Sequence, residues 1–512
     1  MRGIIIASLI SALANTVTGV AIPADGQAIE ERQVQPISTA IGPAGTSYIY
    51  ALASPIPANI ASQLVAAPAI PTPTTGVLPD GGAENTPVGG APLTPPVVAS
   101  GNVTKAGFRS VAYYDDWYIY ERAFPPQNLV SSQWTHINVA FWNVGPTGEA
   151  FVVDTEACFT KPLLNPNPGA GALHGIYEQI FRMKNQNRNL KILLCIGGWK
   201  YAQDPAWTAN LDTTEKRMTF AKSVARWVID LGLDGADLDW EYPMSEVTAA
   251  AHAETLKFLR QELDAAASSV GASRMELSIA ASVGPDKIQW LKLKEIDAYL
   301  DFINIMGYDM AGSWLTTAGH ASPFFMATDG STPDAAVVPA VDMYIAGGID
   351  PRKLNIAMPI YGRAFENTDG PGKPYSGVGP GTYPVEPGIY DYKALPLTQQ
   401  DIIFEDEKIL ASWSYNAQAR RMVSFDTPRI TYLKAKYVKE RGLGGIAFWQ
   451  TSADKMMKGS NLVESAIEGL GGRGTFEQFD NHLEYKSSKY PNVRVYDGVE
   501  VEGVNDLALG LV

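Results

Sequence analysis

The stretch that decides the fold is LDGADLDWEYP, residues 233–243, in which Asp237, Asp239 and Glu241 alternate with apolar residues. Side chains along a β-strand point alternately to opposite faces, so this spacing predicts a strand with all three carboxylates on one face. The alternatives are a solvated acidic strand end and a calcium site. An outward acidic face would interrupt helix packing, and no glycine-punctuated calcium loop surrounds these residues. The pattern therefore favours acids that point into an interior.

Seven further short, β-rich apolar runs occur before and after this strand. Amphipathic segments such as residues 213–231 and 249–268 separate most of them, as in a parallel sheet with crossover helices. Eight such strands predict an α/β protein, with a closed (β/α)8 TIM barrel rather than an open doubly wound sheet. The predicted strands are residues 110–114, 136–141, 191–196, 235–238, 277–283, 302–306, 354–359 and 445–449.

The interval between the seventh and eighth strands is too long to hold only one helix. Residues 378–414 contain the Gly, Pro and Tyr typical of short strands and turns. We therefore expect a small, β-rich α+β insertion domain at about residues 362–430, which would form one wall of a cleft.

In a barrel the acidic strand would end at the C-terminal rim, where barrel enzymes place their catalytic groups. Asp237 and Asp239 would then line the lumen, and Glu241 would point to the mouth. Three acids confined in one site repel one another, so at least one should have a raised pKa and keep a proton near neutral or mildly acidic pH.

The N-terminal residues predict export. Residues 1–21 contain Arg2, then an apolar run over residues 3–14, then small residues, which is the order of a secretory signal peptide. The competing interpretation is a membrane anchor, but the run is shorter than the ~20 apolar residues that a span needs, and no later stretch qualifies. The sequence therefore predicts a secreted, extracellular protein without a membrane span.

The segment after the signal peptide has the composition of a linker. Residues 22–106 are rich in Pro, Ala, Gly and Thr, with 13 prolines among residues 22–104, and predict a disordered linker or pro-segment. Asn102-Val103-Thr104 is an N-glycosylation acceptor triplet. The catalytic barrel is expected over residues 107–470, and residues 471–512 form a C-terminal tail with no predicted role.

Charge and cysteine content exclude several functions. The formal net charge is −14, from 40 basic and 54 acidic residues, so nucleic acid is not an expected partner. The two cysteines, Cys158 and Cys195, cannot form a disulfide framework or a four-thiolate zinc site, and the five histidines show no ligand spacing. We therefore expect no metal and no cofactor. We also expect the protein to be a monomer.

Residues 234–241 resemble the Asp-Gly-x-Asp-x-Asp-x-Glu signature of the family 18 glycoside hydrolases, the chitinases and their relatives. The signature is long and specific, and the resemblance extends over nearly all of residues 107–470. It is carried further by residues 111–117 (VAYYDDW), 136–141 (HINVAF), 195–199 (CIGGW), 306–309 (MGYD), 359–363 (PIYGR) and 448–449 (FW).

The resemblance implies a mechanism without a protein nucleophile, because this family uses the substrate's own acetamido group. Glu241 would be the general acid and later the base. Asp239 would hold the acetamido N–H, Asp237 would share a proton with Asp239, and the Tyr308 hydroxyl would steady the acetamido carbonyl. The implied activity is hydrolysis of β-1,4-linked N-acetylglucosamine in chitin, with retention of configuration.

The resemblance also nominates residues that bind the sugar. Aromatic rings give sugar rings flat apolar faces, and Trp449 would form the floor of the subsite at the cleaved bond. Asp309 and Arg363 would add polar contacts, although Arg363 has the alternative role of a structural ion-pair partner. The full set is Tyr113, Phe141, Gly198, Trp199, Met306, Asp309, Trp314, Tyr361, Arg363 and Trp449.

The chain departs from the family pattern at three positions. Cys195 stands where Ser is usual, Ala112 where Gly is common, and Gly307 where Thr or another residue often sits. Cys195 is not expected to be a nucleophile, because no histidine motif accompanies it and a strand-buried thiol is usually inert. The departures leave the three carboxylates intact.

Three other functions remain as alternatives. An endo-β-N-acetylglucosaminidase acting on N-glycan cores would share the carboxylates and the mechanism, although the insertion favours the chitinase branch and a deep cleft. A chitin-binding lectin on the same barrel would typically lack the acid that Glu241 provides. A structural wall protein would explain the linker but not the carboxylates.

Overall fold

The computed structural model describes residues 39–41, 47–49, 107–332, 335–496 and 498. The predicted signal peptide, Asn102, most of the predicted linker and the end of the C-terminal tail lie outside the described residues. Residues 1–68 form one unit and residues 69–512 another. In the first unit β1 (Thr39–Ile41) and β2 (Ser47–Ile49) pair antiparallel. Among the described helices, none combines the length and apolarity needed to cross a bilayer.

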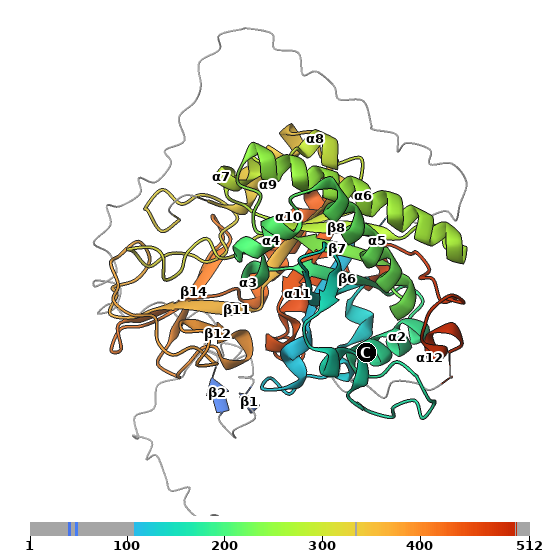
Figure 1. The fold of residues 1–512 in the computed structure, drawn as a ribbon. Helices are drawn as coiled ribbons and strands as arrows, with labels where there is room; N and C mark the ends of the chain where they lie inside the picture. Colours follow the sequence, from blue (N-terminus) through green and yellow to red (C-terminus); the bar gives the residue numbers. More distant parts are fainter. Residues whose placement is uncertain (1–38, 42–46, 50–106, 333–334, 497, 499–512) are drawn as a thin grey trace, which may run out of the picture. The chain divides into compact units, whose positions relative to one another are not determined.

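Eight parallel strands form a closed barrel in the second unit (Figure 1). Their order is β3-β16-β10-β9-β8-β7-β6-β4, and pairing of β3 with β4 closes the ring. The predicted α/β class and TIM barrel are confirmed, with every predicted strand in place. The barrel strands are β3 (Arg109–Asp115), β4 (His136–Val144), β6 (Lys191–Gly197), β7 (Gly235–Asp239), β8 (Glu276–Ala281), β9 (Phe302–Met306), β10 (Leu354–Pro359) and β16 (Gly445–Trp449); β5 (Ala150–Val152) extends β4 as a hairpin.

Helices cover the outside of the barrel, and their ends follow local sequence rules. The Thr213 side chain caps α5, and Ser245 begins α6 with a capping box. Gly232 ends α5 in the left-handed conformation, with φ of 70°. The helices are α2 (Gly175–Gln186), α3 (Trp199–Ala202), α4 (Pro205–Asn210), α5 (Thr214–Leu231), α6 (Glu246–Val270), α7 (Pro285–Ile288), α8 (Leu293–Ile296), α9 (Val337–Ala346), α10 (Pro428–Glu440), α11 (Leu462–Leu470) and α12 (Pro491–Arg494).

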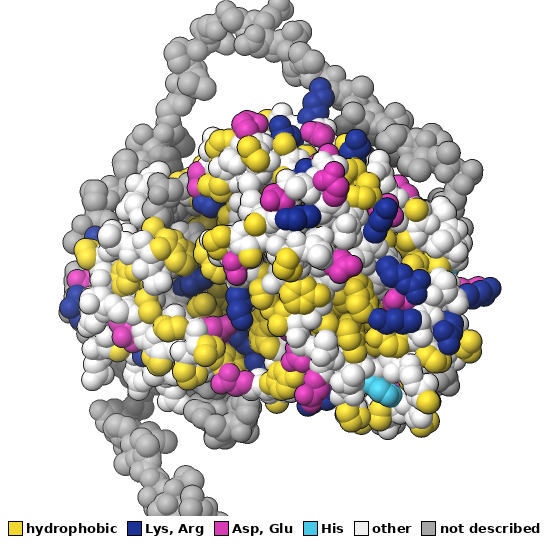
Figure 2. All heavy atoms as spheres, viewed as in Figure 1, with side chains coloured by type: hydrophobic (Ala, Val, Ile, Leu, Met, Phe, Trp, Pro, Cys, Tyr) yellow, Lys and Arg dark blue, Asp and Glu magenta, His cyan; other side chains and the backbone are white. Residues whose placement is uncertain are grey.

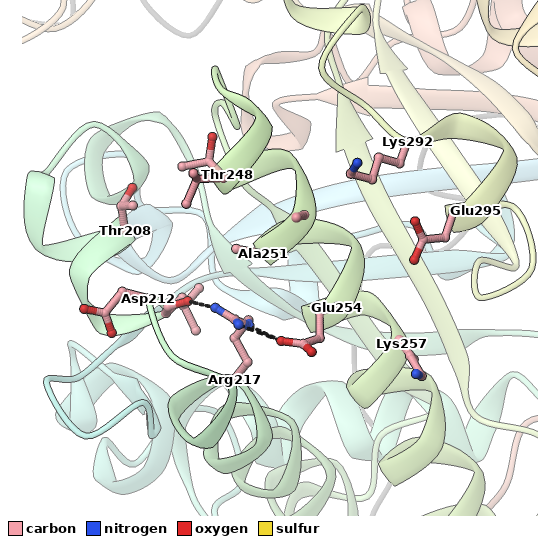
Figure 3. A pocket seen from close by; sticks show the side chains of 12 residues that line it. Thr208, Asp212, Arg217, Thr248, Ala251, Glu254, Lys257, Lys292 and Glu295 are labelled. Atoms are coloured by element: carbon pink, nitrogen blue, oxygen red, sulfur yellow. Dashed lines mark hydrogen bonds and ion pairs between the residues drawn. The ribbon is translucent and has the colours of Figure 1, made fainter.

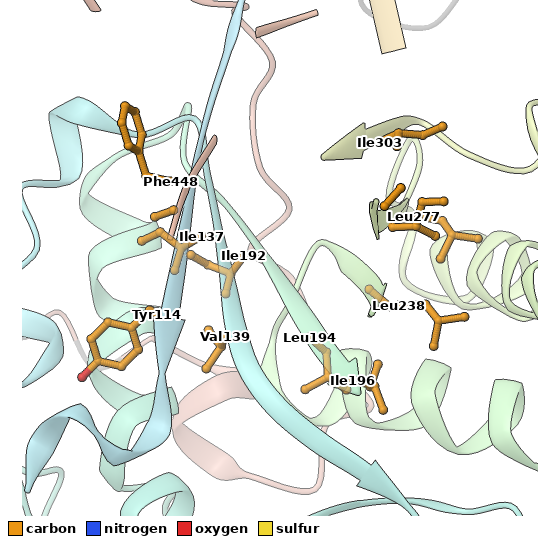
Figure 4. Close-up of a cluster of buried hydrophobic side chains, with 14 of the residues drawn as sticks. Tyr114, Ile137, Val139, Ile192, Leu194, Ile196, Leu238, Leu277, Ile303 and Phe448 are labelled. Carbon is orange, nitrogen blue, oxygen red and sulfur yellow. The ribbon is translucent and has the colours of Figure 1, made fainter. Parts of the chain in front are cut away.

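The main core lies between the strands and these helices. Leu194, Ile196 and Leu238 belong to it, and Figure 4 shows such side chains along the barrel strands. Alternate residues of the same strands face the lumen, where Val111, Leu193 and further side chains form a smaller cluster. The barrel is therefore a filled core, and only its mouth is available for a ligand.

The predicted insertion between strands seven and eight is present. It is a five-stranded antiparallel sheet in the order β12-β11-β15-β14-β13, with one 3-10 turn at Tyr392–Ala394. Figure 1 shows the sheet at one side of the barrel. Its strands are β11 (Tyr361–Phe365), β12 (Ile389–Asp391), β13 (Ile402–Asp406), β14 (Ala411–Asn416) and β15 (Arg421–Ser424).

The described part of the C-terminal tail, residues 471–496, packs against the N-terminal end of the barrel. Glu477 N donates to Phe108 O at 3.0 Å, just before β3 begins. The Asn481 amide donates to the carbonyls of Lys184, Asn187 and Leu190. The Tyr485 hydroxyl donates to Leu233 O at 2.5 Å. This C-terminal segment thus covers the end of the barrel opposite the mouth.

Candidate active site

The three carboxylates follow one another upward through the barrel. Asp237 and Asp239 belong to β7, and Glu241 comes two residues after Asp239, just past the strand end. All three are buried, with exposure rising from 0 % at Asp237 to 4 % at Asp239 and 8 % at Glu241. The order agrees with the predicted arrangement, in which Glu241 is nearest to the mouth.

Asp237 is held by three hydrogen-bond donors. Its Oδ1 accepts from Ser278 Oγ at 2.5 Å, and its Oδ2 accepts from the Tyr113 hydroxyl and from Cys195 Sγ, each at 3.1 Å. Burial raises the pKa of Asp237, while these donors lower it. Cys195, one of the three departures from the family pattern, therefore still donates a hydrogen bond to this acid.

Asp239 has no such support. Its Oδ1 is a buried atom without a hydrogen-bond partner among the described residues. The pKa of Asp239 is raised well above its ordinary value, by burial first and then by the charges of Glu241 and Asp237. The expected proton in this group is thus favoured more by burial than by mutual repulsion. An unsatisfied acceptor at this depth fits a ligand N–H.

Glu241 is tuned as a proton donor. The pKa of Glu241 is raised to about 7, with burial as the largest cause and the charge of Asp309 as a smaller one, although hydrogen bonds from the Tyr242 hydroxyl and the Trp199 backbone act in the opposite direction. The Gln203 amide donates to the Glu241 backbone carbonyl at 2.7 Å and fixes the turn after β7. A carboxyl that keeps its proton near neutral pH is suited to general acid catalysis.

Several predicted binding residues meet at the mouth, where β9 ends and β11 begins. The Tyr361 hydroxyl and Arg363 Nε both donate to Asp309 Oδ1, at 2.5 and 2.6 Å. The Arg363 guanidinium lies 4.7 Å from the ring centre of Trp314, which is 54 % exposed. Arg363 is thus an ion-pair partner of Asp309, and its polar contact with a sugar stays a prediction. Tyr308 packs edge-on against Tyr361 at 6.1 Å.

Burial, then the charges of Asp239 and Glu241, raise the pKa of Tyr308 well above its ordinary value. Its hydroxyl therefore stays protonated beside these two acids and can donate to a bound carbonyl.

Aromatic rings line another part of the mouth. Trp449 stacks on Phe141 with ring centres 5.6 Å apart and contacts Tyr113 edge-on at 6.0 Å. Met306 packs against the same cluster. The row continues from Phe141 to Trp117, whose ring lies 6.3 Å away and is 39 % exposed. Trp117 was not among the predicted binding residues, although its position just after β3 was a signal for it.

Gly197 and Gly198 permit a close approach of β6 to β7. A Cβ at Gly197 would lie 2.1 Å from Asp239 O, and one at Gly198 would lie 2.8 Å from the Phe141 ring. Gly198 N donates to Asp239 O at 2.9 Å, so Gly198 positions the acidic strand. Trp199 follows directly and is 62 % exposed.

Figure 2 shows the molecular surface hollowed between the insertion and the barrel.

The opposite end of the barrel holds a cluster with metal-like spacing. His136, Glu276 and Glu477 offer ligand atoms within 4.8 Å of one another. Lys191 Nζ and Arg109 Nε lie 3.4 and 3.3 Å from Glu477, so side-chain cations already balance the acids. We call these five residues the basal cluster. Its charges pair internally, which is the chemistry of a structural ion-pair network and not of a metal centre.

A pocket of about 570 Å³ lies on the outer surface between α4, α5, α6 and α8 (Figure 3). Arg217 donates to Glu254 at 2.6 Å and to Leu211 O at 2.7 Å within it. None of the predicted site residues lines this pocket, and its charged groups face solvent or one another.

The sequence profile of the family described as glycosyl hydrolases family 18 matches residues 109–454. The chain belongs to this family. Among curated relatives, Chitinase 1 of Aphanocladium album and Endochitinase 1 of Metarhizium robertsii are each 38 % identical over 414 residues, covering 78 % of this chain and 94 % of each relative. Among solved structures, the catalytic domain of psychrophilic chitinase B from Arthrobacter has a TM-score of 0.65 at 25 % identity, covering 71 % of this chain and 95 % of that chain.

The predicted resemblance is thereby confirmed, and the chain is a glycoside hydrolase. The roles of individual residues and the domain boundaries stay predictions.

Proposed function

We propose that this family 18 enzyme is a secreted chitinase that cleaves β-1,4 linkages of chitin and N-acetylglucosamine oligomers with retention of configuration. The observation that carries the proposal is the contrast within one acid pair: Glu241, with a pKa of about 7, sits two residues from Asp239, whose buried Oδ1 has no partner in the described chain. One group can give a proton, and the other can accept an amide N–H. The names of the curated relatives support chitin as the substrate.

The mechanism follows from what each side chain can donate or accept. Glu241 donates its proton to the glycosidic oxygen as the bond to the anomeric carbon breaks. The acetamido oxygen of the same sugar attacks that carbon and forms an oxazolinium ion, so no protein nucleophile is required. Asp239 accepts the acetamido N–H and stabilises the cation. The Tyr308 hydroxyl donates to the acetamido oxygen and holds it in line.

The second half of the reaction restores the acid. Glu241, now a carboxylate, takes a proton from a water molecule that attacks the anomeric carbon on the face left by the first product. The oxazolinium ring opens and restores the free acetamido group. Because the anomeric carbon has been inverted twice, its configuration is retained. Because the first step needs protonated Glu241, the rate should fall as the pH rises above about 7.

Specificity and chemistry depend on the same acetamido group. We expect efficient cleavage of fully acetylated oligomers and poor cleavage where the sugar at the bond is glucosamine, since its amine cannot form the oxazolinium ion. The measurement is initial rates on defined oligomers that differ only in the acetylation of one sugar. Efficient cutting between two glucosamine units would contradict participation by the substrate.

The alternatives differ in products. Product analysis on defined chitin oligomers and on a glycopeptide with an N-glycan core separates chitinase, endo-β-N-acetylglucosaminidase and lectin in one experiment. We expect shorter N-acetylglucosamine oligomers from chitin and no release of the glycan. The insertion beside the mouth, which carries Tyr361 and Arg363, favours a deep cleft for a linear polymer. Secretion as a monomer is proposed from the sequence alone.

A further inference from the structure

Arg122 makes an unusual set of contacts for a residue of a surface loop. It follows β3, and its side chain is only 4 % exposed. Its two terminal nitrogens each donate to a different carboxylate at 2.9 Å, one on Glu386 and one on Asp391. The guanidinium also lies 4.2 Å from the ring centre of Tyr383. A planar fork that bridges two acids and stacks on a ring is chemistry that only Arg offers.

These contacts join two parts of the chain that are far apart in sequence. Arg122 belongs to the barrel loop that carries Trp117, while Glu386, Asp391 and Tyr383 belong to the insertion. Asp391 is the end residue of β12 and pairs directly with Tyr361 of β11. Arg122 is therefore connected, through its ion pair with Asp391, to the strand that carries Tyr361 and Arg363 at the mouth.

The two parts of the chain that Arg122 joins each carry a group of side chains at the mouth, and we call these two groups the walls of the cleft. One wall is the aromatic row of Trp449, Phe141 and Trp117, and the other is the group formed by Tyr361, Arg363 and Asp309 on β11 and after β9. Trp117 is the member of the row furthest from Trp449. A shift of the loop relative to the insertion would change the spacing between these two walls at the Trp117 end.

Burial makes the joint stiff. The Asp391 side chain is 1 % exposed, and among the described residues its other ion-pair partner is Lys393, whose Nζ lies at 3.3 Å. Removing the guanidinium would leave a buried acid with one neighbouring cation, so the loop and the insertion are strongly coupled while Arg122 is present.

We propose that Arg122 is a positioning residue that fixes the spacing between the two walls of the cleft and so sets the affinity for long chitin chains. This inference rests on the proposed function. Sugars that reach Trp117 depend on the spacing, whereas the sugar at the cleaved bond contacts residues held by the barrel strands. Arg122 contacts Glu386 and Asp391 but neither Asp239 nor Glu241, so we expect the chemical step itself to be unaffected.

The test is steady-state kinetics of Arg122→Gln on a hexamer of N-acetylglucosamine and on an aryl glycoside of the dimer. We expect KM for the hexamer to rise about tenfold, which corresponds to about 1.4 kcal/mol of binding free energy, with kcat unchanged. Both constants for the dimer glycoside should stay at the wild-type values. Arg122→Lys should lie between the two proteins, because an ammonium keeps the charge but not the fork.

A matched control is Arg260→Gln. Arg260 is 7 % exposed in its side chain and bridges Asp264 and Asp301, but at the end of the barrel opposite the mouth. The Arg260→Gln substitution should lower the melting temperature without changing the ratio of the KM for the hexamer to the KM for the dimer glycoside. If Arg122→Gln does not fold, Glu386→Gln removes only the outer arm of the fork and should raise the hexamer KM by a smaller factor.

An unchanged KM ratio in a folded Arg122→Gln or Glu386→Gln variant would overturn the inference, as would an equal change in Arg260→Gln. Failure of the proposed function is a separate result, because it would show as no hydrolysis of either substrate by the wild-type enzyme.

Discussion

Carboxyl groups are buried at both ends of the barrel, but their pKa values are shifted in opposite directions. At the mouth, no cation of the described residues lowers the pKa of Asp239 or Glu241, and both pKa values are raised. In the basal cluster, burial would raise the pKa of Glu477, but Arg109, Lys191 and His136 lower it below its ordinary value. The same desolvation thus yields proton donors at one end and a fixed anion at the other.

The difference shows that counter-charge, and not burial, decides what a buried acid does in this molecule. A carboxylate beside Arg and Lys stays charged, and Glu477 in this way joins the C-terminal segment to β3, β4 and β6. A buried carboxyl without a neighbouring cation keeps its proton, and loss of that proton destabilises the folded protein. Mutations at the two ends should therefore separate activity from stability.

The largest effect is expected for Glu241→Gln at the mouth. The amide cannot give a proton to the glycosidic oxygen, so kcat should fall by roughly 10³-fold or more, within the range of general acid catalysis and above. Binding of chitin oligosaccharides, measured by calorimetry, should remain. Glu246→Gln, an exposed acid at the start of α6, is the matched control and should keep full activity. A Glu241→Gln protein with half the wild-type turnover would rule out the assignment.

At the other end, Glu477→Gln should cost stability and not activity. Its removal leaves Lys191, 1 % exposed, and Arg109 with less compensation, and breaking such buried pairs costs about 3–5 kcal/mol. Chemical denaturation gives the free energy of unfolding, and kcat per folded molecule should match the wild type. Glu484→Gln, exposed in the same C-terminal segment, should change neither. A stable Glu477→Gln enzyme with lost activity would show that the two ends are not independent.

The two acids should also give opposite pH dependences of stability. Because burial raises the pKa of Glu241 from 4.5 to about 7, its contribution is complete below about pH 4.5 and is lost as the pH rises through 7. Glu477, with a lowered pKa, contributes above the ordinary carboxyl range and loses that contribution as the pH falls.

Relative to wild type, Glu241→Gln should therefore gain up to about 3 kcal/mol of unfolding free energy between acid and mildly alkaline pH. Thermal melts across this range provide the measurement. For Glu477→Gln the loss of stability should shrink toward low pH. Parallel curves for the two variants would contradict the role given to counter-charge.

The sequence predicted the mouth far better than the base. Alternation at Asp237, Asp239 and Glu241 encodes a strand face directly, because neighbouring positions share one strand. Glu477 and His136 are far apart in the sequence and come into contact only in the folded barrel, so no local residue spacing predicts this contact. Trp117 and Arg122 were missed for a related reason: their partners, Phe141 and Asp391, come from other elements.

The smallest effect is expected where the chain departs from its family, at Cys195→Ser. The thiol is a weak donor to Asp237 Oδ2 at 3.1 Å, and a hydroxyl in its place would donate more strongly. The pKa of Asp237 should fall, which makes this acid resemble Glu477 of the basal cluster. We expect the acidic limb of the kcat profile to move down by less than about one pH unit, since one hydrogen bond is worth about 0.5–1.5 kcal/mol. Cys158→Ser, at a thiol outside the lumen, should leave the profile in place; a shift in both variants would mean that loss of a buried thiol, and not the donor to Asp237, is responsible.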